Sequence, residues 1–139
     1  MAVNTQFSIA VHIMAGLGCC HQNAKTSTEL AQSVNTSASF IRRTMAKLSK
    51  AGLVETATGK AGTCWLAQKP KQISLLDIYH AVSAPKAFSI HSYPENKPCE
   101  VSCHIKGALD KALDKTQRAF EASLAKISLE DIIADIKQH

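Results

Sequence analysis

Two groups of side chains in this sequence have types and spacings that could do chemistry. Arg42, Arg43 and Lys47 would share one face of a helix, where cationic groups can contact phosphate oxygens and arginine can also bind the O6 and N7 atoms of guanine. Cys99 and Cys103 lie four residues apart in the segment PCEVSCH, where thiols could be oxidised or bind a metal. The first group suits a nucleic acid, and the second suits a chemical signal.

The basic residues lie within an order of elements that is typical of a winged helix-turn-helix. Thr26 and Glu29 have capping-box spacing and predict the start of a short helix, which ends in the polar turn Asn35-Thr36-Ser37. A longer helix follows from Ser37, and Ala51-Gly52 ends it. The next residues fit a strand, a glycine-bearing hairpin tip and a returning strand. The residues of the longer helix at inward-facing spacing are Phe40, Ile41, Thr44, Met45 and Leu48.

The positive charge of the chain is concentrated in the same region. Residues 1–86 contain nine Lys/Arg and three Asp/Glu, a balance of +6, whereas residues 87–139 contain seven and eight, a balance of −1. A basic face on a single helix is commonly no more than a solvated surface. The short helix, the polar turn and the hairpin with a lysine at its tip together favour DNA binding instead.

The rest of the sequence predicts four further elements. A first helix begins at Asn4 or Thr5 and ends near Gly18, and Ser74 with Asp77 starts another short helix. A loop with three prolines occupies residues 83–98. Ser128 with Asp131 starts a last helix, which we expect to fold back onto the core. Between them a long helix begins at about Cys103, and its apolar stripe is Ile105, Leu109, Leu113, Thr116, Phe120, Leu124 and Ile127.

The stripe on this long helix indicates a partner subunit. Its average step of about 3.67 residues keeps the stripe nearly straight along an α-helix. A helix of roughly 34 Å is too long for so small a domain to cover, so we expect the stripe to meet its copy in a homodimer. The alternative is that it pairs with the first helix of the same chain.

The expected fold class is therefore mainly α with a small β-wing. We divide the chain into a winged helix-turn-helix domain (1–82), a cysteine-bearing sensor loop (83–102), and a dimerisation helix with a closing helix (103–139). No apolar run approaches the ~20 residues of a membrane span, and the first residues do not fit a signal peptide. We expect a cytoplasmic protein with no membrane partner, whose five cysteines are not structural disulfides.

In combination these elements resemble the Rrf2-type winged-helix regulators, the bacterial transcription factors of the IscR, NsrR and CymR type. The similarity covers essentially the whole chain, through TELAQSVNTSASFIRRTMAKLSKAGLV, the hairpin, the connector into ISLLDIYHAV and the closing KISLEDI. A cysteine-bearing loop before a long helix belongs to the same pattern. The resemblance implies a homodimer that binds a pseudo-palindromic double-stranded DNA operator, in most members as a repressor.

The resemblance also implies roles for single residues. The helix from Ser37 to Lys50 matches the recognition helix, whose early residues reach base edges in the major groove. The candidates for base contacts are Ser39, Arg42 and Arg43. The candidates for phosphate contacts are Thr28, Lys47 and, at the wing tip, Lys60. Ser37, which begins the recognition helix, completes the predicted DNA-binding set.

The loop before the long helix departs from the family pattern. Iron–sulfur members carry three cysteines there, whereas this chain offers Cys99 and Cys103, and a common cluster takes four ligands. Cys99-Glu100-Val101 is closer to a branch that has a single cysteine in a Cys-x-Val sequence and no cluster. We therefore expect no cofactor, with Cys99 as the redox-sensing thiol and Cys103 as the candidate resolving thiol.

Three alternative functions stay open at this point. An iron–sulfur cluster or a zinc ion would use Cys99, Cys103, His104 and His91 as ligands. An enzyme would use the same four residues as a thiol site, but the sequence has no nucleophile–base pairing, Gly-rich phosphate loop or paired-carboxylate motif, so we expect no enzyme. A dimerisation module that has lost DNA binding would not need the basic cluster around Arg42.

Overall fold

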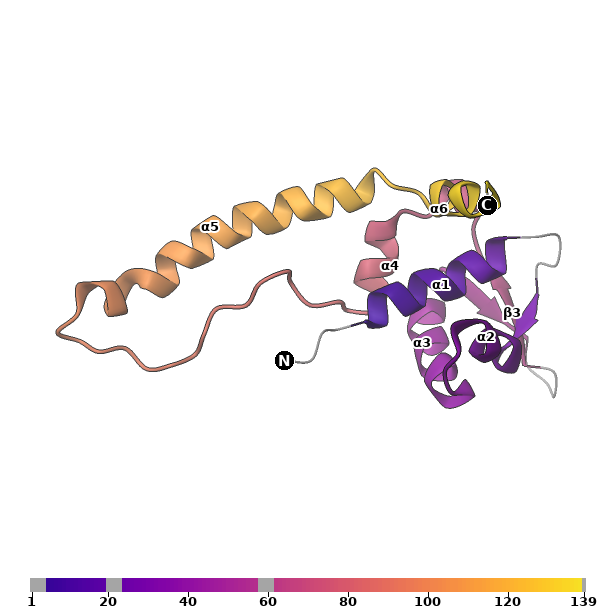
Figure 1. The fold of residues 1–139 in the computed structure, drawn as a ribbon, viewed down its shortest axis with the longest axis horizontal. Helices are drawn as coiled ribbons and strands as arrows, with labels where there is room; N and C mark the ends of the chain where they lie inside the picture. The colour runs from indigo at the N-terminus through magenta and orange to yellow at the C-terminus, as the bar shows by residue number, and fades with distance from the viewer. Residues whose placement is uncertain (1–4, 20–23, 58–61, 139) are drawn as a thin grey trace.

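The computed structural model describes residues 5–19, 24–57 and 62–138. They form a rounded head and a long arm that projects from it (Figure 1). The head contains α1 (Gln6–Gly18), β1 (Lys25–Thr26), α2 (Ser27–Val34), α3 (Ala38–Lys50), β2 (Val54–Thr56), β3 (Thr63–Leu66), the 3₁₀ turn η1 (Pro70–Gln72), α4 (Leu75–Ala81) and α6 (Leu129–Lys137). The arm consists of α5 (Glu100–Ala125) and an extended segment, residues 83–98, that we call the strap.

Local capping chemistry fixes where three of the helices begin. Thr26 with Glu29, Ser74 with Asp77, and Ser128 with Asp131 each form a complete capping box, in which the hydroxyl accepts a backbone N–H and the acid accepts one in return. All three pairs confirm the predicted helix starts. At the other end of α2, Asn35 has a φ of 68° and ends the helix in the left-handed conformation that asparagine tolerates.

The core of the head lies between α1 and the elements around it. Ile13, Met14 and Leu17 of α1 are buried against side chains from α2, α3, α4 and α6. The last helix closes this core, because Leu129 is fully buried and its backbone N–H donates to Ile73 O at 2.8 Å. Gly18 allows the close approach, since a Cβ there would lie 2.7 Å from Cδ1 of Ile133. The predicted return of the last helix is thus confirmed, and it packs on α1 and η1.

The wing is a three-stranded antiparallel sheet in the order β1-β3-β2. Strands β2 and β3 are the predicted hairpin, with Glu55 paired to Trp65. Strand β1 was not predicted, because it has two residues and its partners on β3 are almost forty positions away. Because β1 leads directly into α2, its pairing with β3 holds the start of α2 against the wing.

The structure corrects three details of the prediction. The long helix begins at Glu100 rather than at Cys103, because Cys99 acts as its N-cap. Thr116 is exposed and Gln117 takes the inward position, where its amide satisfies polar groups that an apolar residue would leave without partners. Phe40 is half-buried at the edge of α3 rather than facing fully inward.

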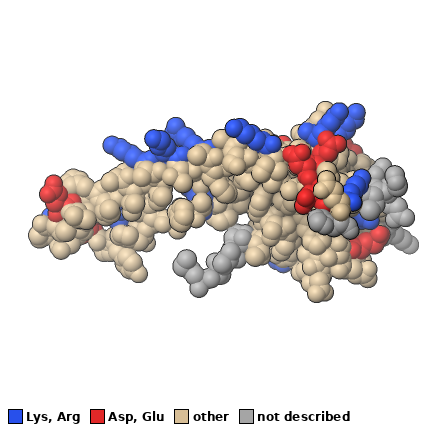
Figure 2. All heavy atoms as spheres, turned by 45° about the horizontal axis from the view of Figure 1, so that its top comes forward, with Lys and Arg blue, Asp and Glu red and all other residues tan. Residues whose placement is uncertain are grey.

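Charge is distributed differently on the arm and on the head. On the face shown in Figure 2, Lys and Arg side chains follow one edge of the arm and also lie on the head, while Asp and Glu side chains lie on the head and at the far end of the arm. Lys111, Lys115 and Arg118 of α5 are all exposed, and Asp114 pairs with Arg118 at 2.9 Å. In the described part of the chain, no helix is long and apolar enough to span a bilayer.

Candidate nucleic-acid interface and thiol site

Helix α3 has one buried face and one basic face. Ile41, Thr44 and Leu48 are fully buried in the head, and Met45 is nearly so. At 100° per residue, the opposite side carries only exposed side chains: Ser39, Arg42, Arg43, Ala46, Lys47, Ser49 and Lys50. The helix contains four cations and no acid. The charged side chains of its outer face are therefore all positive, and an exposed helix of this kind fits the width of a DNA major groove.

The start of α3 is fixed by Ser37, whose hydroxyl accepts the backbone N–H of Phe40 at 3.2 Å. Because that hydroxyl oxygen caps the helix, Ser37 holds the start of α3 in place, in addition to any contact that it makes with a ligand. The Arg43 guanidinium lies over the Phe40 ring, 5.6 Å from its centroid. This stacking orients Arg43 along the exposed face without neutralising it.

Arg42 borders a groove between α3, the start of α2 and the base of the wing. The groove has a volume of about 540 Å³. Its lining includes Ser27, Arg42, Ala46, Lys50 and Thr56. The structure therefore brings the first turn of α2, where Thr28 is exposed, to the same side of the head as the basic face of α3. Backbone N–H groups at the N-terminus of α2 are suited to a phosphate oxygen.

Two results qualify the predicted DNA-binding set. Lys60, assigned to the wing tip, lies outside the described residues. Lys50 was not in that set, yet it is exposed and borders the same groove as Arg42. Its helical spacing of three from Lys47 was the signal that could have included it.

The start of α5, which carries both thiols of the arm, lies at the far end of the arm, away from the head (Figure 1). The Cys99 sulfur accepts the backbone N–H of Ser102 at 3.4 Å and so caps α5. The Cys103 thiol donates to Lys97 O at 3.5 Å. Asn96 N–H donates to the Ser102 hydroxyl at 2.7 Å, and the Lys106 ammonium donates to Tyr93 O. The end of the strap and the first turn of α5 are therefore joined through the segment that carries both thiols.

The head thiols are arranged differently. Cys64 is buried in β3 and donates to Lys25 O of β1 at 3.1 Å. Burial, together with the negative charge of Glu29, raises the pKa of the Cys64 thiol, which keeps it protonated and unreactive. Cys99 is exposed. An oxidant in solution thus reaches Cys99 far more readily than Cys64.

The alternative metal site is not assembled in the described residues. No group of three or more His, Cys, Asp or Glu side chains there is close enough to hold an ion. The His91 ring instead contacts the Tyr93 ring at 5.6 Å, and Cys103 is engaged by backbone carbonyls. In the described arrangement these side chains are therefore not brought together as the four ligands of a cluster or of a tetrahedral zinc ion.

Comparisons with known proteins agree with this geometry. Residues 3–135 match the model of the Rrf2 family, described as an iron-dependent transcriptional regulator. The Bacillus subtilis (strain 168) protein YwnA, provisionally named an HTH-type transcriptional regulator, is 36% identical over 133 residues, which cover 94% of this chain and 96% of YwnA. A crystal structure provisionally described as a DNA-binding protein is 33% identical, with a TM-score of 0.73, and the match covers 92% of this chain and 98% of that one.

More distant structures share the fold. The oxidized form of Staphylococcus aureus CymR is 20% identical with a TM-score of 0.69, and 96% of each chain is covered. The relatives are described as regulators rather than as enzymes. The family model spans nearly the whole chain, and YwnA is similar over nearly its whole length. The chain therefore belongs to the Rrf2 family of DNA-binding transcriptional regulators.

Proposed function

We propose that the protein is a homodimeric repressor that binds a pseudo-palindromic operator and loses or gains affinity when Cys99 is oxidised. The observation that carries the DNA-binding part is the outer face of α3, where four cations and no acid lie opposite a fully buried face. We infer that Arg42, Arg43 and Ser39 read base edges and that Lys47 and Thr28 contact phosphates. A repressor of this kind acts by occupying DNA that the transcription machinery needs.

The dimer would form through α5. Leu109, Leu113 and Leu124 of the predicted stripe are half-buried within the chain, so the stripe is not wholly free. About 60° around the helix lies a second row, which shares Ile105 and Thr116 with the stripe. Its side chains are small or apolar and most are exposed: Val101, Ile105, Ala108, Ala112, Thr116, Ala119 and Ser123. Small side chains let two helices approach closely, and the exposed Lys111, Lys115 and Arg118 flank this row on the side away from the predicted stripe. We infer that this second row meets its copy.

The thiol chemistry would begin at Cys99. Its thiolate attacks a peroxide oxygen, the O–O bond breaks, and the products are a sulfenic acid and hydroxide. The Cys103 thiol, one helical turn away, can then attack the sulfenic sulfur and release water to give a disulfide. In either product the Cys99 sulfur carries a new substituent and is a poorer acceptor for the Ser102 N–H, so we infer that the first turn of α5 rearranges.

The experiment that tests this function begins with selection of duplexes from a random DNA pool by the reduced protein. We expect an enriched inverted repeat. The double variant Arg42→Ala/Arg43→Ala should bind the enriched duplex at least ~30-fold more weakly, because bidentate base contacts are worth about 1–3 kcal/mol each. Unchanged affinity would refute the assignment of α3 as the reading helix.

Peroxide treatment of the same complex tests the regulatory part. We expect a change in affinity for the wild type that dithiothreitol reverses and that Cys99→Ser abolishes. Cys19→Ser provides a matched control for a thiol outside the arm. A response that persists in Cys99→Ser would refute Cys99 as the sensor. In vitro transcription from a promoter that contains the enriched sequence should fall when the reduced protein is added.

A further inference from the structure

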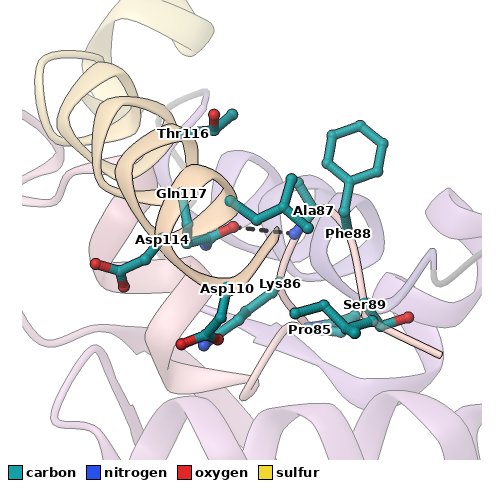
Figure 3. A pocket seen from close by; sticks show the side chains of 11 residues that line it. Pro85, Lys86, Ala87, Phe88, Ser89, Asp110, Asp114, Thr116 and Gln117 are labelled. Atoms are coloured by element: carbon teal, nitrogen blue, oxygen red, sulfur yellow. Dashed lines mark hydrogen bonds between the residues drawn. The ribbon is translucent and has the colours of Figure 1, made fainter. Parts of the chain in front are cut away.

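One buried amide connects three separate segments where the arm joins the head. Gln117 of α5 has only 7% of its surface exposed. Its Nε2 donates to the Tyr79 hydroxyl at 3.0 Å, and its Oε1 accepts the backbone N–H of Ala87 at 3.0 Å. The Tyr79 hydroxyl in turn donates to Pro85 O at 2.6 Å. Helix α4, the strap and α5 thus meet at this point, and Figure 3 shows the Gln117–Ala87 bond.

Aromatic packing surrounds this polar centre. The Tyr79 ring makes edge-on contacts with Phe120 of α5 and with Phe7 of α1, at centroid distances of 5.7 and 5.9 Å. On the surface, His80 of α4 approaches Glu121 of α5 at 3.3 Å. We call Tyr79 and Gln117 the joint, because helix α5 packs on the head at α4.

The strap is packed less closely just beyond the joint. A cavity of about 570 Å³ is lined by residues 85–90 of the strap and, on the side of α5, by Asp110, Leu113, Asp114 and Gln117 (Figure 3). The two bonds at Gln117 and Tyr79 therefore fasten the strap root to both helices.

A hydrogen-bonded joint restrains the angle between α5 and the head more strictly than an apolar contact does. If α5 turned or slid by one residue, the Gln117 amide would lose both of its partners, and a buried polar group left unpaired is costly. An apolar contact of equal size tolerates small rotations. The arm is also a lever, because the 17 residues from Gln117 back to Glu100 span about 25 Å. A tilt of about 10° moves its tip by about 4 Å, roughly the 3.4 Å rise of one base pair.

We propose that the Tyr79–Gln117 joint sets the distance between the two reading helices of a dimer, and so determines which half-site spacing the protein accepts. This inference rests on the proposed function. Within a symmetric dimer, half-site spacing follows from the geometry that relates the two recognition helices. Tyr79 and Gln117 touch no DNA; they act by positioning α3 relative to the partner's copy.

The test compares spacing preference rather than affinity alone. Random duplexes are first selected with the wild type, and the enriched inverted repeat is then made with its spacer unchanged, one base pair longer and one base pair shorter. We expect the wild type to prefer its own spacing by at least ~10-fold. Tyr79→Phe, which keeps the ring, and Gln117→Met, which keeps the volume, should bind the same half-site but reduce that preference to below ~3-fold. Arg118→Met, an exposed change on the same helix away from the joint and from the proposed dimer row, should leave it unchanged.

Each outcome bears on the proposal. A ten-fold preference that survives in both joint variants overturns the inference while leaving the proposed function intact. A wild type that enriches no inverted repeat refutes the proposed function, and the inference falls with it. If Gln117→Met does not fold, as judged by circular dichroism, Tyr79→Phe alone decides, since it removes a single oxygen atom.

Discussion

The phosphate-contact role of Lys47 makes a quantitative prediction about salt. Lys47 lies in the last turn of α3, exposed and with no acid on its helix. If each protomer of a dimer uses Lys47 to neutralise one phosphate, Lys47→Ala removes two contacts. Each contact contributes about 0.9 to the slope of log affinity against log salt, so the slope should become shallower by about 1.8.

That change in slope has a measurable size. Between 50 and 200 mM salt the wild type should lose about 12-fold more affinity than Lys47→Ala does, which follows from the slope difference of about 1.8 over a four-fold salt range. The fold should be unaffected, because alanine is a better helix former than lysine at an exposed position. Fluorescence anisotropy on the selected duplex at four or five salt concentrations measures the slope.

A matched control separates the contact from general charge. Lys137 lies in the last turn of α6, is exposed like Lys47, and belongs to a helix at another part of the head. Lys137→Ala removes the same charge from an equivalent helical position, so its slope should equal that of the wild type. If Lys47→Ala keeps the wild-type slope, or if Lys137→Ala changes it as much, the assignment of Lys47 to a phosphate is wrong.

Three further predictions concern the dimer, the core and the buried thiol. Ala112→Glu places a charge in the proposed α5 contact and should raise the dimer Kd more than ~100-fold by sedimentation, whereas Ala122→Glu on another side of α5 should not. Gly18→Ala puts a Cβ 2.7 Å from Ile133 Cδ1 and should lower the free energy of unfolding, measured by urea titration, by about 1–3 kcal/mol. Adding Ile133→Val removes that Cδ1, so the double variant should recover part of the lost stability. Burial raises the pKa of the Cys64 thiol in the folded state, so the folded protein keeps a proton that the unfolded chain releases, and the free energy of unfolding should fall as pH rises past about 8.5. In reducing buffer, Cys64→Ala should flatten that fall, and an equal fall in the variant would contradict the burial argument.

Local signals in the sequence determine most of the head. The three capping boxes each depend on two residues three positions apart, so Thr26 with Glu29 is visible without any knowledge of the fold. The inward face of α3 follows from helical spacing for the same reason. Strand β1 gave no such signal, because two residues have no periodicity and its pairing depends on where β3 lies.

The arm was harder to predict because its geometry depends on distant contacts. Helical spacing alone placed Thr116 in the apolar stripe, whereas the Tyr79 hydroxyl and the Ala87 N–H favour an inward amide at Gln117. Those partners lie 38 and 30 positions away in the chain. The N-cap role of Cys99 was missed for a related reason: serine, threonine, aspartate and asparagine are the usual caps, so a cysteine gives no start signal.

The placement of the thiols constrains how a signal could reach DNA. The start of α5, which Cys99 caps, and α3 lie at opposite ends of the molecule, and α5 alone is about 39 Å long. No thiolate charge acts usefully over that distance in salt, so an electrostatic effect of oxidation on DNA is excluded. A mechanical route is available, because Val101, the first residue of the proposed dimer row, belongs to the turn that Cys99 caps. A rearranged first turn would shift how α5 meets its copy, and the Tyr79–Gln117 joint would pass that shift to the head as a rigid displacement of α3. The same stiffness that fixes half-site spacing is therefore what a thiol switch at the tip requires.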